Sequence, residues 1–448
     1  MKKKDKLKHK AWIITVDMGY GHQRASYPLR HLAKDGIIAA NNYPGITEKD
    51  KSAWANSRKS YEFISRFKKV PFLGEKTFEI YDRLQSIPKF YPRRDLSKPN
   101  LQLKGIYNMI KKFDWGKHLI DKLDKDPLPM IHTFFVTAFM AEIHGYSGEI
   151  YCLATDTDIS RTWAPLNPTR SKINYFAPNS RVAERLKLYG VRPNKIYVTG
   201  FPLPDENVGE NLKVVKQDLG RRLINLDSKK IYLSQYQKTI VRHIGENNLK
   251  KNPTRPLTIT FAVGGAGAQR ELGREIIISL TREILAGKVN INLVAGVHPQ
   301  VNNFFHQAIK EAGLNRKLNQ GVKVIFTKSK PEYFKRFNRI LKTTDILWTK
   351  PSELSFYCAL GIPIVMAPPI GSQEIFNRQW LQSIGAGINQ EDPRYTNEWL
   401  LDWIDSGWLA EAAMQGFLEA PKYGTYNIEK IIFHQSGQAK RVKTVLQY

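Results

Sequence analysis

Short apolar runs that end in glycine-rich or polar turns recur along the chain. The first run covers residues 11–16 and stops at the turn Gly19-Tyr20-Gly21-His22. A continuous apolar run of this length is typical of a parallel strand buried on both faces. Apolar residues at helical spacing follow between Ala25 and Ala33, with Gly36 expected just past the helix end. The pattern predicts a strand, a turn and a helix that open a parallel α/β domain.

A second series of the same kind begins at residue 257. Its first apolar run, 257–263, is followed by the turn Gly264-Gly265-Ala266-Gly267 and by a helical pattern over 272–285. The other strand-like runs of the two series are 130–135, 150–154, 195–198, 290–295, 322–326, 346–348 and 362–366. Two successive series, each opening at a glycine turn, predict an α/β protein with two Rossmann-like domains.

The length of 448 residues also favours two domains, of roughly 200 residues each. The predicted divisions are an N-terminal domain over 1–215, a polar and basic interdomain region over 216–256 and a C-terminal domain over 257–425. We expect the final segment, 426–448, to pack back on the N-terminal domain.

Lysines and arginines alternate with large aromatic residues at about 50–125, for example at Phe67, Phe90, Arg93 and Trp115. The whole chain holds 69 Lys and Arg against 41 Asp and Glu, a formal net charge of +28. Such an excess indicates an anionic partner. Aromatic rings beside cations suit an anionic membrane surface, and a solvated helical cap is the alternative. Single-stranded nucleic acid ranks last, because no recognisable nucleic-acid module accompanies these residues.

Cys152 and Cys358 each lie in an apolar run, which predicts two buried free thiols in a reducing cytoplasm. No stretch approaches the roughly 18 apolar residues of a membrane span. We therefore expect a cytoplasmic protein that can lie peripherally on the inner face of the cell membrane.

The turn at 264–267 has two interpretations. Glycines between a strand and a helix let backbone N–H groups approach a phosphate, and the helix dipole favours negative charge there. A tight turn without a ligand is the other. A second polar group follows the strands at 346–348 and 362–366, where open α/β sheets bind ligands. Within it, Ser352 and Glu353 also fit a simple helix cap.

Asp156-Thr157-Asp158 raises a metal-binding alternative, because a D-x-D after a strand can hold a divalent cation. The second Rossmann series with its phosphate-type turn argues against that interpretation, and no metal ligands are assigned. His298, at the end of another strand, is expected to be a turn residue.

An ordered series of motifs covers most of residues 11–385. They stand at 19–25, 131–134, 154–156, 174–180, 198–202, 264–267, 349–351 and 371–377. In this order they resemble the family that joins the lipid II N-acetylglucosaminyltransferase of peptidoglycan synthesis with the mono- and diglycosyldiacylglycerol synthases. The resemblance implies the GT-B fold, in which two Rossmann-like domains face a cleft.

The resemblance also implies a function. It is an inverting hexosyl transfer from a UDP-sugar to a membrane lipid at the cytoplasmic face, with the UDP-sugar as co-substrate and neither cofactor nor metal. The N-terminal domain would hold the acceptor and the C-terminal domain the nucleotide-sugar. Two alternatives stay open: a nucleotide-sugar epimerase or hydrolase of the same fold, and a non-catalytic nucleotide-sugar-binding protein.

His22 is the expected general base, because a histidine near neutral pKa suits removal of the acceptor hydroxyl proton. Asp156 would orient or replace it. The expected donor-binding residues are Gly265, Gly267, Lys350, Glu353, Gln373, Glu374 and Asn377. The chain departs from the family pattern at Phe356, where the family carries a ribose-binding glutamate. Glu353, about one helical turn earlier, can supply that carboxylate.

Overall fold

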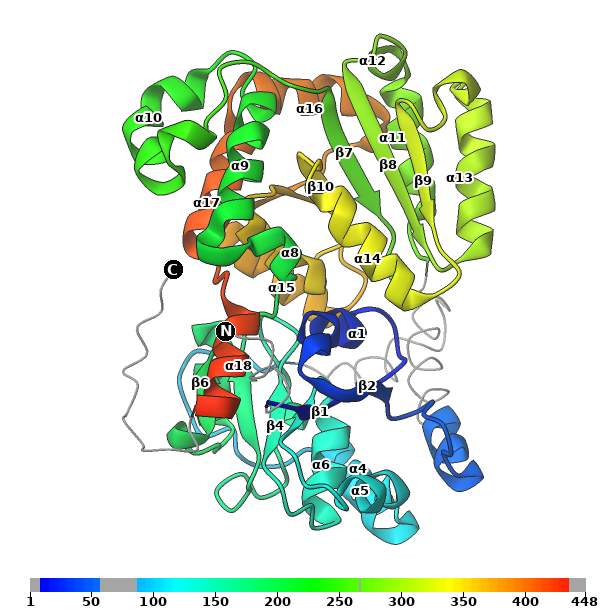
Figure 1. The fold of residues 1–448 in the computed structure, drawn as a ribbon, viewed down its shortest axis with the longest axis vertical. Helices are drawn as coiled ribbons and strands as arrows, with labels where there is room; N and C mark the ends of the chain where they lie inside the picture. The colour runs from blue at the N-terminus through cyan, green and yellow to red at the C-terminus, as the bar shows by residue number, and fades with distance from the viewer. Residues whose placement is uncertain (1–8, 57–86, 266, 435–448) are drawn as a thin grey trace. The chain divides into compact units, whose positions relative to one another are not determined.

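The computed structural model describes residues 9–56, 87–265 and 267–434 (Figure 1). The chain divides into two compact units. The first comprises the chain up to Pro202 together with the segment from Tyr423, and the second comprises Leu203–Lys422. Four sequence features fall outside the described residues, wholly or in part: the basic start of the chain, residues 57–86 of the basic-aromatic insertion, Ala266 of the glycine turn, and residues 435–448 of the final segment.

The first unit contains a six-stranded sheet in the order β2-β1-β3-β4-β5-β6, with all neighbours parallel. Its strands are β1 (Ala11–Thr15), β2 (Ala33–Ala39), β3 (Met130–His132), β4 (Ile150–Leu153), β5 (Asn174–Ala177) and β6 (Ile196–Val198). The chain goes from β1 to one side for β2 and then to the other side for β3. The strand order therefore reverses between β1 and β3, which makes the carboxyl ends of these two strands the expected place for a ligand.

The connection after β1 differs from the prediction. The α-helix α1 covers only Gly21–Ser26 and continues as the 3-10 helix η2 (Tyr27–His31). Pro28 has no N–H to donate, so the α-helical bonding pattern ends there. The expected helix end is in fact the start of β2, and Gly36 lies inside this strand at a φ of +86°. β2 is an edge strand whose residues 34–36 are exposed, and its apolar run is limited to Ile37–Ala39.

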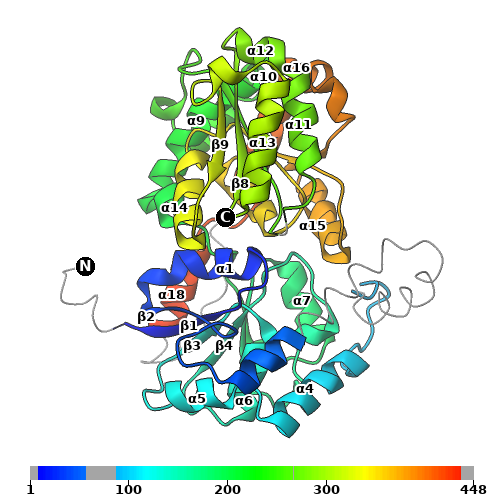
Figure 2. The same cartoon turned by 90° about the vertical axis from the view of Figure 1, so that its right-hand side faces the viewer.

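Helices cover both faces of the first sheet. They are α4 (Leu101–Phe113), α5 (Lys117–Leu123), α6 (Phe135–Ile143), η3 (Arg161–Trp163), α7 (Ser180–Leu188), η4 (Pro193–Lys195) and α18 (Gly424–His434). The described part of the basic-aromatic insertion includes α4, which packs along α6 (Figure 2). Its amphipathic pattern explains this, since Leu103, Tyr107 and Ile110 are buried while the lysines of the helix are exposed.

The helix α18 belongs to the first unit although it comes from the end of the chain (Figure 1). The Nδ2 atom of Asn427 donates to the carbonyl oxygen of Thr199 at 2.9 Å. The His31 Nε2 atom lies 3.2 Å from a carboxylate oxygen of Glu429. At the helix start, a Cβ on Gly424 would lie 2.1 Å from the carbonyl oxygen of Phe201, so the backbones approach closely there.

The second unit contains a six-stranded parallel sheet in the order β12-β11-β10-β7-β8-β9. Its strands are β7 (Leu257–Ala262), β8 (Val289–Gly296), β9 (Val322–Phe326), β10 (Ile346–Thr349), β11 (Ile364–Met366) and β12 (Gly387–Asn389). Here the order reverses between β7 and β10, so their carboxyl ends form the corresponding switch point. Together the two sheets confirm the predicted α/β class with two Rossmann-like domains.

Helices also cover both faces of the second sheet. Figure 2 shows α9 and α14 on one side of β8 and β9, with α11 and α13 on the other. The helices of this unit are α8 (Asp205–Val208), η5 (Glu210–Leu212), α9 (Lys213–Leu226), α10 (Ile231–Ile244), η6 (Glu246–Asn248), α11 (Arg270–Ser279), α12 (Thr281–Leu285), α13 (Pro299–Glu311), η7 (Asn315–Lys317), α14 (Lys330–Leu341), η8 (Glu353–Leu360), α15 (Ser372–Ser383), η9 (Pro393–Tyr395), α16 (Thr396–Asp405) and α17 (Trp408–Glu419). The segment expected as an interdomain region thus holds α9 and α10. Both bury apolar side chains, such as Leu223 and Ile240, within the second unit.

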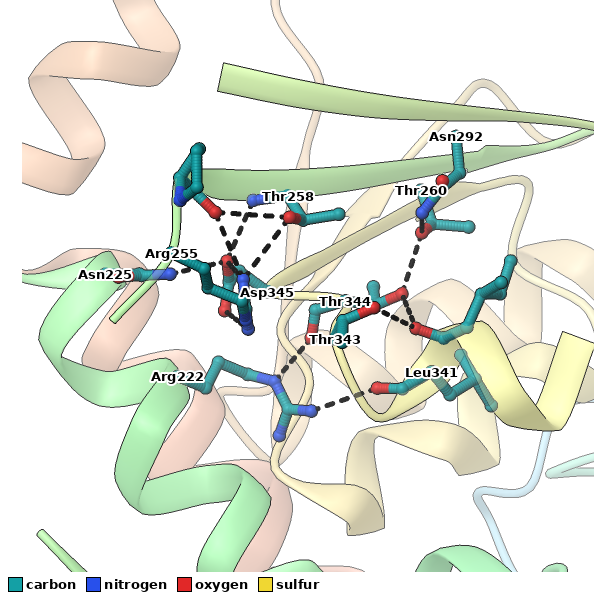
Figure 3. Close-up of polar contacts among 12 residues, drawn as sticks. Arg222, Asn225, Arg255, Thr258, Thr260, Asn292, Leu341, Thr343, Thr344 and Asp345 are labelled. Carbon is teal, nitrogen blue, oxygen red and sulfur yellow. Dashed lines mark hydrogen bonds and ion pairs between the residues drawn. The ribbon is translucent and has the colours of Figure 1, made fainter. Parts of the chain in front are cut away.

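A buried polar network fixes the start of β10 (Figure 3). The carboxylate of Asp345 accepts from both terminal nitrogens of Arg255, at 2.5 and 2.6 Å, and from the backbone N–H of Thr258 at 2.8 Å. Arg222 of α9 donates to the carbonyl oxygens of Thr344 and Leu360 at 2.7 and 2.9 Å. Burial lowers the pKa of Arg222 to about 10, so it is still charged at neutral pH. The network holds in place the strand whose other end carries Lys350.

Both cysteines are buried free thiols, as predicted, and burial raises the pKa of each. Over the part of the chain that the structure describes, no helix has the length and apolar character needed to cross a membrane.

Candidate functional site

In the glycine turn after β7, the backbone lies very close to neighbouring side chains. A Cβ on Gly264 would lie 2.5 Å from Cε of Lys350, and a Cβ on Gly267 would lie 2.9 Å from a methyl carbon of Val301. Gly267 also has a φ of +69°, which side chains other than glycine rarely adopt. Its N–H donates to the carbonyl oxygen of Gly264 at 2.8 Å. The turn therefore needs glycines for packing, and it brings its backbone directly against Lys350.

Lys350 follows β10, the strand that pairs with β7 at the switch point. Its aliphatic chain lies along Gly264, and its ammonium group forms an ion pair with the carboxylate of Glu374. The second oxygen of that carboxylate accepts the backbone N–H of Ile370 at 2.6 Å and that of Gly371 at 3.4 Å. Two of the predicted donor residues are thus in direct contact, although 24 positions separate them.

Two further bonds connect the loops at this edge of the sheet. The Nδ2 atom of Asn377, a buried residue of α15, donates to the carbonyl oxygen of Pro351 at 3.3 Å. The Nε2 atom of Gln269 donates to the carbonyl oxygen of Pro368 at 2.8 Å. The loops that follow β7, β10 and β11 therefore form one connected group.

All seven predicted donor residues belong to this group of loops. Gly265 and Gly267 lie in the glycine turn, Lys350 and Glu353 follow β10, and Gln373, Glu374 and Asn377 lie in α15. Their direct contacts include the Lys350–Glu374 ion pair, and Asn377 bonds to Pro351, the neighbour of Lys350. What each residue binds stays a prediction.

Phe356 marks the place where the family pattern carries a carboxylate. The side chain is buried, with 3% exposure, and its ring centroid lies 5.3 Å from that of Trp380. The helix η8 is a 3-10 helix in which residues three apart lie above one another. Glu353, the half-buried first residue of η8, is therefore on the same side as Phe356, one turn earlier. This geometry keeps Glu353 as the candidate to replace the missing carboxylate.

His298 contacts the glycine turn, a contact that the sequence did not reveal. Its ring lies 3.7 Å from where a Cβ on Gly267 would stand, and it hydrogen-bonds to the backbone of Gly265. Burial lowers the pKa of His298 below its usual value, and the bond to Gly265 partly opposes this. The available signal was its position at the end of β8, the other neighbour of β7 in the sheet.

His22 occupies the switch point of the first sheet. It lies in the first turn of α1, just after β1, and its Nδ1 atom is 2.7 Å from the carbonyl oxygen of Thr133, just after β3. The rings of Phe134 and Trp163 flank it, with centroids 4.9 and 6.4 Å away. A carbonyl oxygen can only accept, so Nδ1 carries the proton and the neutral ring has its lone pair on Nε2. That tautomer is the one a general base requires.

The two aspartates of the D-x-D sequence differ in their surroundings. Asp158 is buried and accepts from Nε and a terminal nitrogen of the buried Arg185, at 2.8 and 2.7 Å. This two-point ion pair occupies both of its oxygens. Asp156 is half-buried in the turn after β4, the strand next to β3. Within the described ranges, no group of three or more His, Cys, Asp or Glu residues is arranged to hold a metal ion.

A pocket in the second unit lies at the amino ends of the strands β7, β8 and β9, whereas the loops described above follow the carboxyl ends of the strands. Arg255, Thr258, Asn292 and Lys323 are among the residues that line it, and three of them are drawn in Figure 3. Its lining includes none of the predicted donor residues.

Several known proteins are similar to this chain. A domain family described as a domain of unknown function (DUF6938) matches residues 308–428. The processive diacylglycerol beta-glucosyltransferase of Bacillus pumilus (strain SAFR-032) is 21% identical over 395 residues, which cover 85% of this chain and 82% of that protein. This similarity supports a divergent member of the GT-B glycosyltransferase family, as the motif series predicted.

Similar solved structures include the UDP-GlcNAc 2-epimerase of Neisseria meningitidis bound to UDP-GlcNAc, at 14% identity. The structural match covers 76% of this chain and 83% of the epimerase chain, with a TM-score of 0.43. MurG of Acinetobacter baumannii is 12% identical and covers 95% of this chain and 99% of its own, with a TM-score of 0.44.

Proposed function

We propose that the chain is an inverting glycosyltransferase that moves a hexose from a UDP-sugar to a membrane lipid at the cytoplasmic face, without a metal ion. The observation that carries the proposal is the convergence at the switch point of the second sheet. There the glycine turn, Lys350 and the start of α15 bring backbone N–H groups and an ammonium group to one place. Such groups bind a diphosphate through hydrogen bonds and opposite charge.

On the donor side, the second unit would hold the nucleotide-sugar. The ammonium of Lys350 would neutralise the charge that develops on the diphosphate as the sugar leaves. Glu353 would accept hydrogen bonds from the ribose hydroxyls in place of the carboxylate missing at Phe356. Gln373 and Asn377, both in α15, would offer side-chain amides to the donor.

On the acceptor side, His22 supplies the base. Its Nε2 atom takes the proton of the lipid hydroxyl as that oxygen attacks the anomeric carbon of the sugar. The bond from the anomeric carbon to the diphosphate oxygen breaks at the same time, UDP leaves with the bonding electrons, and the configuration inverts. The carbonyl of Thr133 holds the ring in orientation throughout and is well placed to stabilise the imidazolium that forms.

Two observations support a lipid acceptor in an anionic membrane. The Bacillus pumilus relative is named for its action on diacylglycerol. In the described part of the insertion, Tyr91 is 65% exposed and lies two positions before Arg93, and Phe113 is 48% exposed and follows Lys112. Exposed aromatic rings beside cations are what an interfacial surface uses.

A transfer assay tests the proposal. The protein is incubated with UDP-glucose, UDP-galactose or UDP-GlcNAc, each labelled in the sugar, and with anionic vesicles that contain diacylglycerol. We expect one donor to put label into the lipid extract with an equal amount of UDP released. Release or isomerisation of the sugar at the same rate without vesicles would favour the epimerase or hydrolase alternative. UDP binding with no reaction of any donor would favour a non-catalytic binding protein.

A further inference from the structure

The carboxylate of Glu374 satisfies three groups that could each bind a phosphate. One oxygen pairs with the ammonium group of Lys350, and the other accepts the N–H groups of Ile370 and Gly371 at the start of α15. The bonds to the N–H groups are ordinary for the third residue of a helix, which often caps the first turn in this way. The pairing with Lys350 is a separate interaction that capping does not require.

The paired ammonium lies at the glycine turn. A Cβ on Gly264 would stand 2.5 Å from Cε and 3.4 Å from Nζ of Lys350. The two charged side chains are largely withdrawn from solvent, with 20% exposure for Lys350 and 12% for Glu374. Over the described residues, this is the one ion pair recorded for Lys350. The cation that the turn presents to a ligand is therefore already neutralised by the protein itself.

An incoming diphosphate and Glu374 need the same partners. Both are anions, and an ammonium group that is little hydrated cannot satisfy two anions at full strength without bringing their charges together. We propose that Glu374 is an internal competitor of the donor diphosphate, so that donor binding displaces its carboxylate from Lys350. The proposal rests on the proposed function for the identity of the anion. It changes the role predicted for Glu374, which was that of a direct ligand of the donor.

Displacement of the Glu374 carboxylate would also affect the neighbouring loops, because hydrogen bonds connect them. Glu374 holds the N–H groups of the loop before α15, and Gln269 ties the same loop to the end of the glycine turn through Pro368. Asn377, one turn later in α15, holds the Lys350 loop through Pro351. Freeing the carboxylate therefore loosens one contact within a connected group. When UDP has formed, the return of Glu374 to Lys350 would favour its release.

A different role for Glu374 makes a different prediction. If its carboxylate binds hydroxyl groups of the donor sugar, removing its charge weakens binding of the UDP-sugar and leaves UDP unaffected. If it competes with the diphosphate, removing its charge strengthens binding of UDP and also of inorganic pyrophosphate, which has no sugar and no base.

Calorimetric titration of the full chain with UDP and with inorganic pyrophosphate separates these outcomes. In Glu374→Gln the side chain still accepts the N–H of Ile370 but no longer pairs with Lys350, and we expect both anions to bind on the order of tenfold tighter. Lys350→Met should weaken both, and the double variant should show no gain over Lys350→Met alone. Glu271→Gln is the matched control, because it removes the same charge at the first turn of α11, where Glu271 contacts Arg270.

The inference is overturned if Glu374→Gln and Glu374→Ala bind pyrophosphate no tighter than Glu271→Gln does, with melting curves showing all three folded. Its failure is distinguishable from failure of the proposed function. Tighter pyrophosphate binding in Glu374→Gln without any binding of UDP would support Glu374 as a competitor of the anion and contradict a UDP-sugar as the donor. Sugar transfer by the natural protein, with no increase in anion affinity in either Glu374 variant, would support the proposed function and contradict the competitor role of Glu374. No binding of either anion to any variant would contradict both.

Discussion

The Nδ1 atom of His22 lies 2.7 Å from the backbone carbonyl oxygen of Thr133. The two residues are 111 positions apart, and they meet because β1 and β3 are neighbours where the strand order of the first sheet reverses. The contact fixes the tautomer of the histidine that the family resemblance had assigned as the general base. The ring is therefore held as the proposed base would need to be.

The approach of Gly264 to Lys350 leads to a prediction for donor binding. Gly264→Ala places a methyl group 2.5 Å from Cε of Lys350, and the lysine must move because it is the more flexible partner. We expect UDP to bind on the order of tenfold more weakly, as for loss of a charged hydrogen bond, with the melting temperature nearly unchanged. Gly105→Ala is a control, since a Cβ there meets no atom within 4 Å. Equal UDP affinities in the two variants would contradict the contact.

The D-x-D sequence gives a prediction for stability. Asp158→Asn leaves the buried Arg185 without its charged partner, and breaking such a pair usually costs about 3–5 kcal/mol. We expect a clearly lower melting temperature, while sugar transfer by the folded protein is insensitive to a chelator such as EDTA. A variant that melts like the natural protein but loses a divalent-metal requirement would instead favour the metal-binding interpretation.

His132 predicts a loss of stability in acid. Burial lowers the pKa of this imidazole to about 3, from an ordinary value of 6.5, so the folded protein holds it neutral. Below pH 6.5 the unfolded chain binds a proton that the folded chain does not, and the free energy of unfolding falls by about 1.4 kcal/mol per pH unit. Melting temperatures from pH 7 to pH 4.5 should therefore fall more steeply for the natural protein than for His132→Gln. Parallel curves would show that His132 does not titrate in this way.

Lys422 predicts a dependence of the same sign, but in base. This buried ammonium donates to the carbonyl oxygens of Phe417 and Ala420, yet burial lowers its pKa to about 8 from 10.5. Between these values the unfolded chain holds a proton that the folded chain has lost, so the contribution of Lys422 to stability rises with pH. Relative to Lys422→Met, the natural protein should gain about 1.4 kcal/mol per pH unit from pH 8 to 9.5. A constant difference between the two would exclude this titration.

Much of the fold follows from the sequence, because the central strands are buried on both faces. Runs such as 257–263 and 346–348 are mostly apolar, and the structure places strands there with shifts of a residue or so at their ends. The edge strand β2 was not predicted, because residues 34–36 are exposed and polar or glycine, and its apolar part is limited to Ile37–Ala39. The 3-10 helix η2 before it was not predicted, because the apolar spacing between Ala25 and Ala33 also fits an α-helix.

The candidate site was harder to predict than the fold. The sequence brought Lys350 and Glu374 into the same list of residues, but not into one ion pair, because their contact depends on how two loops fold back at the sheet edge. His298 was missed since its role depends on β8 being next to β7, a matter of strand order. The Asp345 network joins residues 90 and 122 positions apart, and no local pattern reports such partners.

The central claim is that His22 removes a proton from an acceptor while the second unit holds the donor. The most direct measurement compares His22→Asn with the natural protein in sugar transfer and in UDP titration. The asparagine amide can still donate to the carbonyl of Thr133, but nothing replaces the lone pair of Nε2. We predict that transfer falls by roughly 10²–10⁴-fold while UDP affinity stays the same. Transfer at the natural rate by the folded His22→Asn protein would contradict the account.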